Sequence, residues 1–340
     1  MPITLAQAQV NTQQAIDYAV IDNLRRYSWL WDNMPFDDSV NPGTGGGTLT
    51  YGYTRLTSAA PSAFRAFNTE YVPGQAARQR YTVDLKPFGG AFTLDRVLAN
   101  LGSATTNELT FQMQQLITSA PIRLQQEMIL GDTAVDGLGF DGLSKALVGT
   151  TTEKTAGYLA GSADWTPTSV TSQSAANMRL DELDDLLSLV VPSHTGGGDQ
   201  GQPGAIPPGV KVILGNTRAI TRVRALARWA SMYTSEKDSL GRQIERYGDW
   251  VLVDAGDRYD GASPIIPTAA GTGLTDIYAV TLGLDAFHAV SMTGRPLVRM
   301  WMPDFGTSGA VKSGELEIGP LAVVLKNTRS AAVLRSVKVA

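Results

Sequence analysis

The sequence predicts an α+β protein made of several distinct parts. Three observations support this prediction: an amphipathic helix near the start with no core beside it, a long hairpin of alternating strands after it, and a second half in which strands and helices alternate. With 43% hydrophobic residues the chain can bury a sizeable core. Its 340 residues accommodate about two domains of ordinary size.

The first predicted element is an amphipathic helix at 12–34. Its apolar side chains recur at intervals of three or four residues, which places them on one face, and Pro35 ends the helix. Nothing that precedes the helix offers a hydrophobic core, so we expect this face to dock elsewhere. The apolar positions are Ile16, Val20, Leu24, Tyr27 and Trp31.

A hairpin is predicted next, after a Gly-rich stretch at 41–47 that is typical of a flexible hinge. Residues 48–86 alternate as two strands around an Ala-, Pro- and Gly-rich tip. A long two-stranded hairpin is marginal by itself in water, and its tip carries Phe64, Phe67 and Tyr71, which need a surface. We expect the hairpin either to fold back on its own domain or to lie across a neighbouring subunit.

The first two segments carry opposite charge. Residues 44–86 have five basic and two acidic side chains, net +3, whereas residues 1–43 have two basic and five acidic side chains, net −3. We therefore expect complementary contacts, which set register more than they add affinity because salt screens them. The basic residues of the second segment are Arg55, Arg65, Arg78, Arg80 and Lys86.

A long helix is predicted at about 103–130, where Gly131 ends it. At 1.5 Å per residue it is about 40 Å long. Pro121 lies in its interior, where it removes the hydrogen bond to the Ile117 carbonyl and bends the helix; two helices broken at Pro121 are the alternative. The apolar stripe consists of Leu109, Met113, Leu116, Ala120, Leu124 and Met128.

Two groups of acidic residues follow the long helix. Asp132, Asp136 and Asp141 lie in a Gly-rich loop, where Asx turns explain them better than calcium because the spacing does not match an EF-hand. A second amphipathic helix is predicted at 174–191. We expect its acids on the solvated face, since no partner base or metal ligand accompanies them. These acids are Asp181, Glu182, Asp184 and Asp185.

The pattern becomes α/β from residue 210. A buried strand at 210–214 leads into a helix whose basic residues fit a solvated face as well as contact with nucleic acid or an acidic neighbour; they are Arg218, Arg222, Arg224 and Arg228. We expect His288 to be a packed or interface histidine rather than a base. Further strands are predicted at 250–253, 277–282, 297–302, 315–325 and 330–339.

Composition and motifs argue against an enzyme. The absence of cysteine excludes thiolate nucleophiles and cysteine-ligated metals, and two isolated histidines, His194 and His288, argue against a His-based triad or metal site. The sequence has no Gly-x-Ser-x-Gly elbow, Walker lysine motif, Gly-x-Gly-x-x-Gly turn or His-Glu-x-x-His helix. We expect no catalytic residue, no cofactor and no metal.

Charge and hydropathy suggest a surface that meets other protein. Only 18% of the residues are charged, below the ~25% of typical soluble domains. A net charge of −4 does not by itself indicate nucleic-acid binding. No stretch reaches the ~18 uninterrupted apolar residues of a membrane span, and no targeting segment is visible, so we expect the protein to stay where it is made, in the cytoplasm.

The order of four motifs resembles one known family. They are the end of the acidic N-terminal helix from Leu24 to Phe36, the hairpin with Tyr51-Gly-Tyr-Thr-Arg55 and Ala63-Phe-Arg65, the long helix running into Gly131-Asp132 and Phe140-Asp-Gly-Leu143, and the strand Val212-Ile-Leu-Gly-Asn216. In this order and spacing the chain resembles, over nearly its whole length, the major capsid proteins of tailed double-stranded DNA bacteriophages, which have the Hong Kong 97 fold.

The resemblance implies a domain plan and a function. The parts are an N-terminal arm at 1–43, an extended loop at 44–86, a peripheral domain at 87–173 with 305–340 whose spine is the long helix, and an axial domain at 174–304. In this family the arm and the loop reach over neighbouring subunits. The implied function is assembly of hexamers and pentamers into an icosahedral virion shell around double-stranded DNA, without an active site.

The resemblance also implies partners and contacts. The partners are further copies of the chain, a separate scaffolding protein, a portal, an optional decoration protein and packaged DNA bound through its phosphates, with no membrane. Some family members cross-link through a lysine of the extended loop; residues 44–85 contain none, so we expect a non-covalent shell, and no N-terminal processing. The expected assembly contacts are Trp29, Trp31, Arg55, Phe64, Arg65, Phe67, Tyr71, Arg78 and Arg80.

Three alternatives stay open at this point, one of them a soluble binding module, which would remain monomeric at high concentration. An encapsulin-like compartment of the same fold would enclose a cargo enzyme, although the long arm and loop favour the phage shell. A metal-dependent hydrolase using Asp132, Asp136 and Asp141 belongs to a different class; a turnover assay or chelator treatment separates it from a shell protein.

Overall fold

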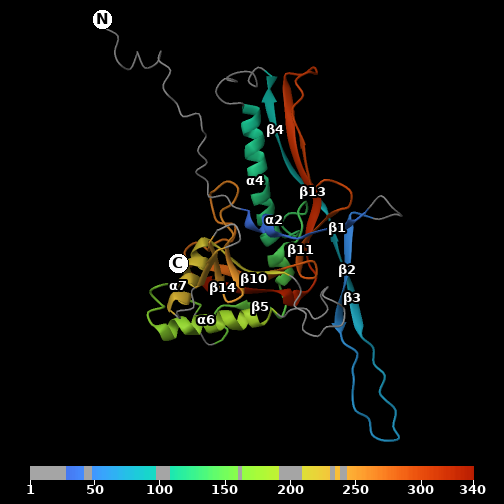
Figure 1. Ribbon diagram of the computed structural model, residues 1–340, viewed down its shortest axis with the longest axis vertical. Coiled ribbons are helices and arrows are strands. Elements are labelled where there is room, and N and C mark those ends of the chain that lie inside the picture. The colour runs from blue at the N-terminus through green and yellow to red at the C-terminus, as the bar shows by residue number, and fades with distance from the viewer. Residues whose placement is uncertain are drawn as a thin grey trace.

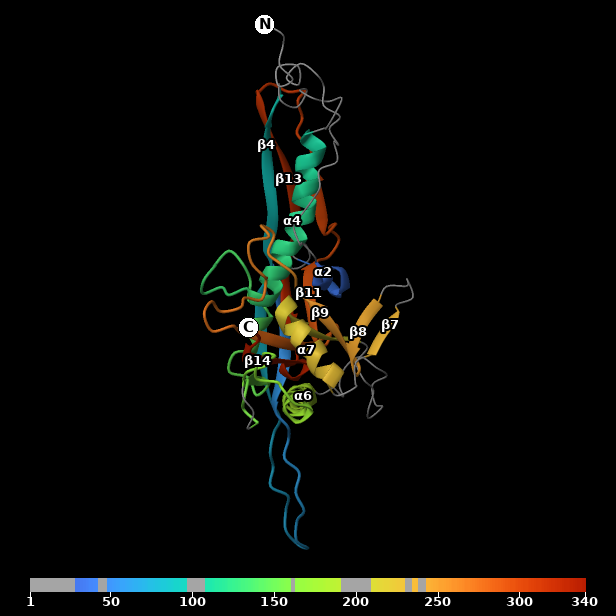
Figure 2. The same cartoon turned by 90° about the vertical axis from the view of Figure 1, so that its left-hand side faces the viewer.

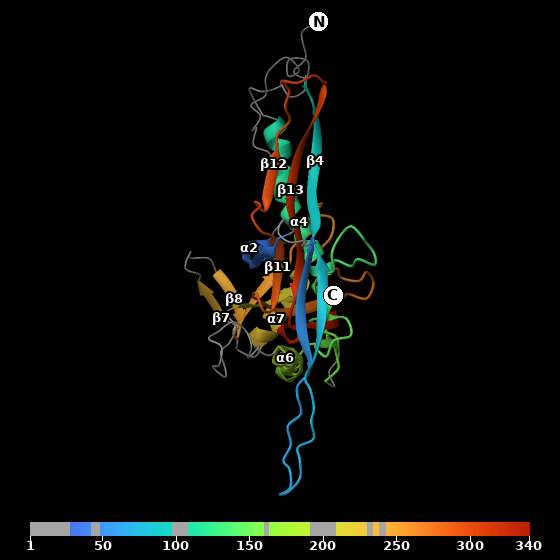
Figure 3. The same ribbon diagram turned by 90° about the vertical axis from the view of Figure 1, so that its right-hand side faces the viewer.

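The computed structural model describes residues 28–41, 48–96, 108–159, 163–190, 209–229, 234–237 and 243–340. Figure 1 shows an elongated molecule with three parts along its longest axis. A rod of one long helix and long strands lies at one end, a body of sheet and helices lies in the middle, and a hairpin points away at the other end. The two side views show the same order (Figures 2 and 3).

The predicted hairpin is confirmed. Strands β2 (Thr50–Ser58) and β3 (Ala77–Asp84) pair antiparallel in a sheet of their own, with a bulge between Leu56 and Ser58. Residues 59–76, called the hairpin tip below, connect them. Only the first part of the hairpin rests on the body, where Tyr51, Tyr53 and Val83 pack against a small buried cluster, so the tip extends beyond it. The cluster consists of Val40, Leu85, Val290 and Val324.

The rod consists of one helix along a strand pair. Strand β4 (Lys86–Asp95) runs antiparallel to β13 (Val311–Leu325), and α4 (Glu108–Leu130) lies along both. Strand β12 (Val298–Trp301) covers the other edge of β13 (Figure 3). The long helix, its apolar stripe and its end before Gly131 are confirmed where they are described, since Met113, Ala120, Leu124 and Met128 are buried.

The proline in the long helix does not divide it. Helix α4 continues through Pro121, so the alternative of two helices is wrong. Ile117, whose carbonyl loses its partner, lies on an exposed side of the helix, where water can donate a hydrogen bond in place of the missing N–H. The apolar residues on both sides of Pro121 belong to one core cluster, which holds the two halves on the same sheet.

The body is one large mixed sheet. Its strand order is β12-β13-β11-β10-β6-β9-β8-β7, and β14 pairs with both β10 and β5 while β1 runs parallel to β11. All five strands predicted after residue 249 are confirmed. The bounds are β1 (Phe36–Val40), β5 (Glu153–Thr155), β6 (Val210–Gly215), β7 (Thr234–Lys237), β8 (Gln243–Tyr247), β9 (Trp250–Asp254), β10 (Leu274–Leu282), β11 (Phe287–Met292) and β14 (Ala331–Lys338).

Helices cover both faces of this sheet. Along β10, Ile277 and Ala279 join one core cluster, whereas Tyr278, Val280 and Leu282 join the other, as the period of two in a strand requires. Helices α6 (Gln173–Ser188) and α7 (Thr217–Trp229) pack on the first face; α4, α2 (Trp29–Asn33) and α5 (Leu143–Leu147) pack on the second. A short 3-10 helix, η1 (Thr328–Ser330), precedes β14.

Side chains at the helix starts explain where α6 and α7 begin. The Ser172 Oγ accepts a hydrogen bond from the Ala175 N–H, and the Asn216 Oδ1 accepts one from the Ala219 N–H, so each caps a backbone donor that would otherwise be unpaired. Of the helix predicted at 12–34, the structure describes Trp29–Asn33, followed by extended Met34. Residues 12–27 and His194 lie outside the described residues.

One expectation about α6 is wrong. Asp181 and Asp184 are exposed as predicted, but Glu182 is only 1% exposed. Its Oε1 accepts a hydrogen bond from the Gly157 N–H, and burial raises the pKa of this carboxyl. The loop that precedes α6 covers Glu182, which lies on the same side of the helix as buried Leu186 four residues later.

Candidate assembly surfaces

The hairpin tip exposes large apolar side chains. The relative exposures of Phe64 and Phe67 are 107% and 97%, so both rings are left without cover from their own chain. Tyr71 and Val72 beside them are also exposed. Burying one such side chain stabilises a complex by about 1.5–3 kcal/mol. Uncovered aromatics on a projecting element are typical of an interface.

Local hydrogen bonds shape the tip. The Arg65 guanidinium donates to the carbonyls of Ala66 (3.2 Å) and Thr69 (3.1 Å), and it lies 5.2 Å from the centre of the Tyr71 ring. A hollow of about 490 Å³ opens among residues 61–72. Arg65 therefore organises the tip through local contacts, while Phe64 and Phe67 stay uncovered.

Arg55 fastens the first part of the hairpin to the body. Its Nε donates to the Lys326 carbonyl at 2.7 Å, and its Nη2 donates to the Leu325 carbonyl at the end of β13. The guanidinium lies 4.5 Å from the centre of the Tyr81 ring, which stacks on Tyr53. Burial raises the pKa of Tyr53 in this stack. We expected Arg55 to be an assembly contact, but most of its N–H donors bind acceptors within its own chain.

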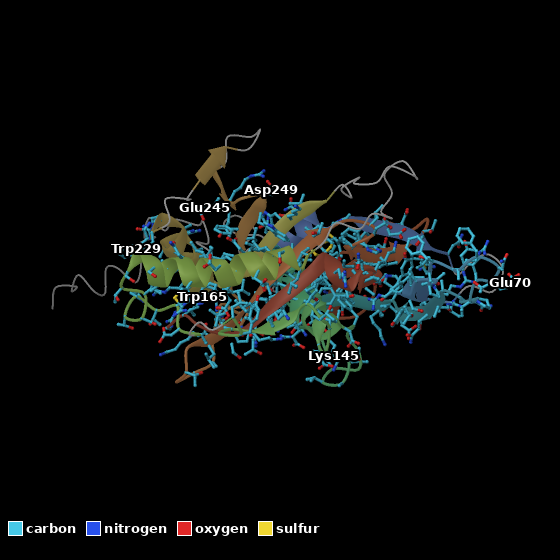
Figure 4. All side chains as sticks on the ribbon, turned by 90° about the horizontal axis from the view of Figure 1, so that it is seen from below. Glu70, Lys145, Trp165, Trp229, Glu245 and Asp249 are labelled. Atoms are coloured by element: carbon cyan, nitrogen blue, oxygen red, sulfur yellow. The ribbon has the colours of Figure 1, made fainter. Side chains whose placement is uncertain are left out.

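The other two basic residues of the hairpin are exposed on β3. The Arg80 guanidinium lies over Gly52, where a Cβ atom would come within 3.0 Å of it. Arg78 pairs in register with Leu56 on the neighbouring strand. Neither makes an ion pair with a described residue. Figure 4 views the molecule from below, with Glu70 of the hairpin tip and Trp229 of α7 on opposite sides of the molecule.

Trp29 and Trp31 have contacts within their own chain. Both are partly buried against the core cluster that contains Leu30, and the edge of the Trp31 ring meets Phe36 at 5.3 Å between centroids. The Leu30 N–H donates to the Gln125 Oε1 at 2.9 Å, which ties α2 to α4. The segment that the sequence left without a core therefore docks on the body, at least over Trp29–Asn33.

A second exposed apolar group lies at the edge strand β12. Val298, Met300, Trp301 and Met302 are all exposed, and we call them the β12 patch. Sequence reasoning missed this surface. The signal was present: in the run from Val298 to Met302 apolar side chains occupy both faces of the strand, which a strand with one solvated face avoids.

His288 is a packed histidine, as predicted. It is fully buried on β11, the edge of its ring meets Tyr51 at 6.1 Å between centroids, and neither ring nitrogen has a hydrogen-bond partner among the described residues. The pKa of His288 is lowered to about 4, first by burial and then by the charge of Lys326, against the opposing effects of Asp37 and Asp285.

This burial makes stability depend on pH. The unfolded chain binds a proton at His288 below about pH 6.5, but the folded chain binds it only below about 4. The contribution of neutral His288 is therefore fully present above pH 6.5 and is lost as the pH falls from 6.5 to 4. We expect the free energy of unfolding, measured with urea, to fall by about 2–3 kcal/mol more between pH 7 and pH 4.5 in the wild type than in His288→Phe. Equal losses in the two proteins would contradict this prediction.

The aspartate loop contains the expected Asx turns. The Ala134 N–H donates to Asp132 at 2.9 Å, and the Leu138 N–H donates to Asp136 at 3.0 Å. Asp141 accepts from the N–H and the hydroxyl of Thr133. The Ala134 N–H and then Lys145 lower the pKa of Asp132. Within the described ranges no three His, Cys, Asp or Glu side chains gather as a metal site, so the hydrolase alternative has no geometric support there.

The basic face of α7 is partly used within the chain. The Arg222 Nε donates to the Val339 carbonyl at 3.2 Å, and Arg224 forms an ion pair with Glu245, whereas Arg218 and Arg228 are exposed. Figure 4 shows Glu245 on the side of the body that carries β8. None of the described helices combines the length and hydrophobicity of a bilayer-spanning segment.

Comparison by sequence finds no relative: no family model and no curated protein matches. Comparison by structure finds similar folds over the whole chain. The holo-SrpI encapsulin of Synechococcus elongatus PCC 7942 matches with a TM-score of 0.62 at 14% identity, covering 100% of this chain and 97% of its own.

Shells from viruses match in the same way. The capsid of Myoviridae phage XM1 has a TM-score of 0.59 at 11% identity, and Mycobacterium phage Ogopogo has 0.59 at 13%; each match covers 98% of this chain and 99% of the other. At these identities the likeness concerns the fold. The long helix beside β4 and β13, the sheet between two layers of helices and the projecting hairpin make this chain a member of the Hong Kong 97 fold.

Proposed function

We propose that this chain is the structural subunit of a closed shell, the major capsid protein of a tailed double-stranded DNA bacteriophage. Hexamers and pentamers of the chain would form the icosahedral shell of the virion. The observation that carries the proposal is the hairpin tip, which exposes Phe64 and Phe67 fully on a fold shared end to end with shell proteins. A folded monomer gains nothing from holding two aromatics in water.

The position of the tip supports a contact between different surfaces of neighbouring copies. In three views the tip points away from the body, so the body of its own chain cannot cover it. A second copy that covers the tip leaves its own tip free for a third. Head-to-tail contacts of this kind close into rings when the rotation between copies allows it, and rings are the capsomers of a shell.

The proposed division of the chain follows the expected one. The arm is 1–43, the extended loop 44–86, the peripheral domain 87–173 with 305–340, and the axial domain 174–304. Support comes from the separate hairpin sheet and from the rod that α4 forms with β4 and β13. The shared sheet, in which β14 pairs with β10, joins the last two domains rigidly.

The proposed contacts divide into two groups. Phe64, Phe67 and Tyr71 at the tip would make the apolar contact, with Arg78 and Arg80 orienting the approach through charge. Arg55 and Arg65 would act by holding the hairpin and its tip in shape, and Trp29 and Trp31 by anchoring the arm. A scaffolding protein, a portal and packaged DNA complete the proposed set of partners.

A shell of the same fold can also enclose protein. The encapsulin match favours this second candidate function, a compartment around a cargo enzyme. The contents of purified particles distinguish the two. We expect nucleic acid that resists added nuclease until the particles are denatured, whereas a co-purifying protein in place of nucleic acid would identify a compartment. A chain that never forms particles, even at high concentration and with its scaffolding protein, contradicts both.

The shell is expected to be non-covalent. Residues 48–85 contain no lysine, and Lys86 at the base of the hairpin lies with its Nζ 3.4 Å from the Gly137 carbonyl of its own chain. Mature particles boiled in detergent should therefore run on a denaturing gel as one band near 36.2 kDa. A ladder of multiples of this mass would contradict the prediction.

A further inference from the structure

A polar cavity lies where the hairpin meets the body. Its volume is about 560 Å³, and it opens between strand β2 of the hairpin, the β10–β11 turn and the segment between β13 and β14. We call it the root cavity. Its lining residues are Thr54, Arg55, Leu56, Thr57, Asp285, Lys326, Asn327, Thr328 and Arg329.

The cavity concentrates positive charge that the chain does not neutralise. Arg55, Lys326 and Arg329 line it, against one acid, Asp285. Neither the Lys326 ammonium nor the Arg329 guanidinium has a hydrogen-bond or ion-pair partner among the described residues; the Lys326 Nζ lies 5.7 Å from the centre of the Tyr51 ring. Two cations on one small hollow repel each other, and an anion between them removes that cost.

Hydroxyl groups surround the same hollow. Thr54, Thr57 and Thr328 line it, and their hydroxyls donate no hydrogen bond to a described residue. Together with the two cations they offer more donors than the two oxygens of one carboxylate can accept. A phosphate group has three or four acceptor oxygens arranged tetrahedrally, so it can use donors that come from several sides.

We propose that the root cavity binds a phosphate group. Lys326 and Arg329 supply its charge partners, and the threonine hydroxyls supply further hydrogen bonds. Because Thr54 and Thr57 belong to the hairpin and Lys326 and Arg329 to the body, the bound group bridges the two. Phosphate therefore fastens the hairpin root beyond the contacts of Arg55. The site lies within one chain and does not depend on shell assembly.

The test uses the purified full-length chain and inorganic phosphate. Isothermal titration at constant ionic strength should show saturable binding of one phosphate per chain. Lys326→Gln with Arg329→Gln should weaken binding about tenfold or more, since hydrogen bonds to charged groups are lost. Arg218→Gln with Arg228→Gln, which removes the same charge from exposed positions of α7, should leave binding unchanged.

Asp285 provides a variant that a folding defect cannot imitate. Its carboxylate faces the same hollow and repels an ionised phosphate, so Asp285→Asn should bind phosphate several-fold more tightly. No saturable binding, equal binding by the Lys326 and Arg329 variant, or acetate binding as tightly as phosphate would each overturn the proposal.

A competition arm identifies the source of the phosphate. A short single-stranded oligonucleotide that displaces inorganic phosphate equally well from the wild type and from the α7 control assigns the site to phosphodiesters of nucleic acid. An oligonucleotide that leaves bound phosphate in place assigns it to free phosphate or a small monoester. Both results retain the phosphate site and differ only in what occupies it.

Discussion

Replacing Phe64 and Phe67 together by Ser is expected to yield a folded chain that no longer assembles. Both rings are fully exposed, so their loss removes no packing from the monomer and thermal unfolding should change by less than about 0.5 kcal/mol. In an assembly, the removal of each ring costs about 1.5–3 kcal/mol of favourable burial, and this cost recurs at every such contact of the shell. Sedimentation velocity should show particles for the wild type and small species for the double variant.

The chain offers a matched control on another surface. Val135 and Leu138 in the aspartate loop are also exposed large apolar side chains, at 87% and 85%. Val135→Ser with Leu138→Ser removes comparable apolar area away from the hairpin and should assemble normally. Normal particles from the Phe64 and Phe67 variant would show that the tip is not an assembly contact.

The second large effect is expected at Arg335, on stability. Its Nε pairs with Glu153 at 2.8 Å and its Nη1 with Asp276 at 2.9 Å, and its Nη2 donates to the Ser144 carbonyl at 3.0 Å. Arg335→Met leaves two partly buried carboxylates without their cation. We expect a loss of about 2–4 kcal/mol in the free energy of unfolding, measured with urea at pH 7.

A weaker ion pair on the same strand serves as the control. Lys338 pairs with Asp164 at 2.9 Å, but 43% of the lysine side chain is exposed, so Lys338→Met should cost less than about 1 kcal/mol. Lowering the pH should reduce the difference between Arg335→Met and the wild type. The pKa of Glu153 is lowered in the fold, so the benefit of its pair is present above its unfolded pKa and is lost as the pH falls through the folded one. Equal stability of Arg335→Met and Lys338→Met would contradict the larger stabilising effect that we assign to Arg335.

Local patterns were sufficient for much of the fold. Alternation at 48–86 predicted the hairpin, the helical period at 103–130 predicted α4, and short apolar runs predicted β6, β9, β10, β12, β13 and β14. Strands β1, β5, β7, β8 and β11 were not predicted. Strand β4 was not predicted, because Gly89 and Gly90 interrupt it; it forms by pairing with β13, more than 200 residues later in the chain, and one of its faces packs on α4.

The candidate surfaces divide in the same way. Exposed aromatics at the tip could be predicted, because a local hairpin has no core in which to bury them. The hydrogen bonds of Arg55 could not be predicted, since its acceptors are carbonyls 270 and 271 residues away in the chain. Glu182 was expected in solvent because it is charged, although Leu186 four residues later shares its side of the helix, and only the fold brings Gly157 to it. The β12 patch required knowing that β12 is an edge strand.

Electron microscopy of the purified wild-type chain, expressed with its scaffolding protein and separated by size exclusion, tests most directly whether this chain builds a shell. We expect uniform closed shells tens of nanometres across, or rings of capsomer size, in which density for the hairpin tip lies against a neighbouring copy. A monomer of 36.2 kDa that persists at raised concentration with the scaffolding protein present would contradict the proposed function.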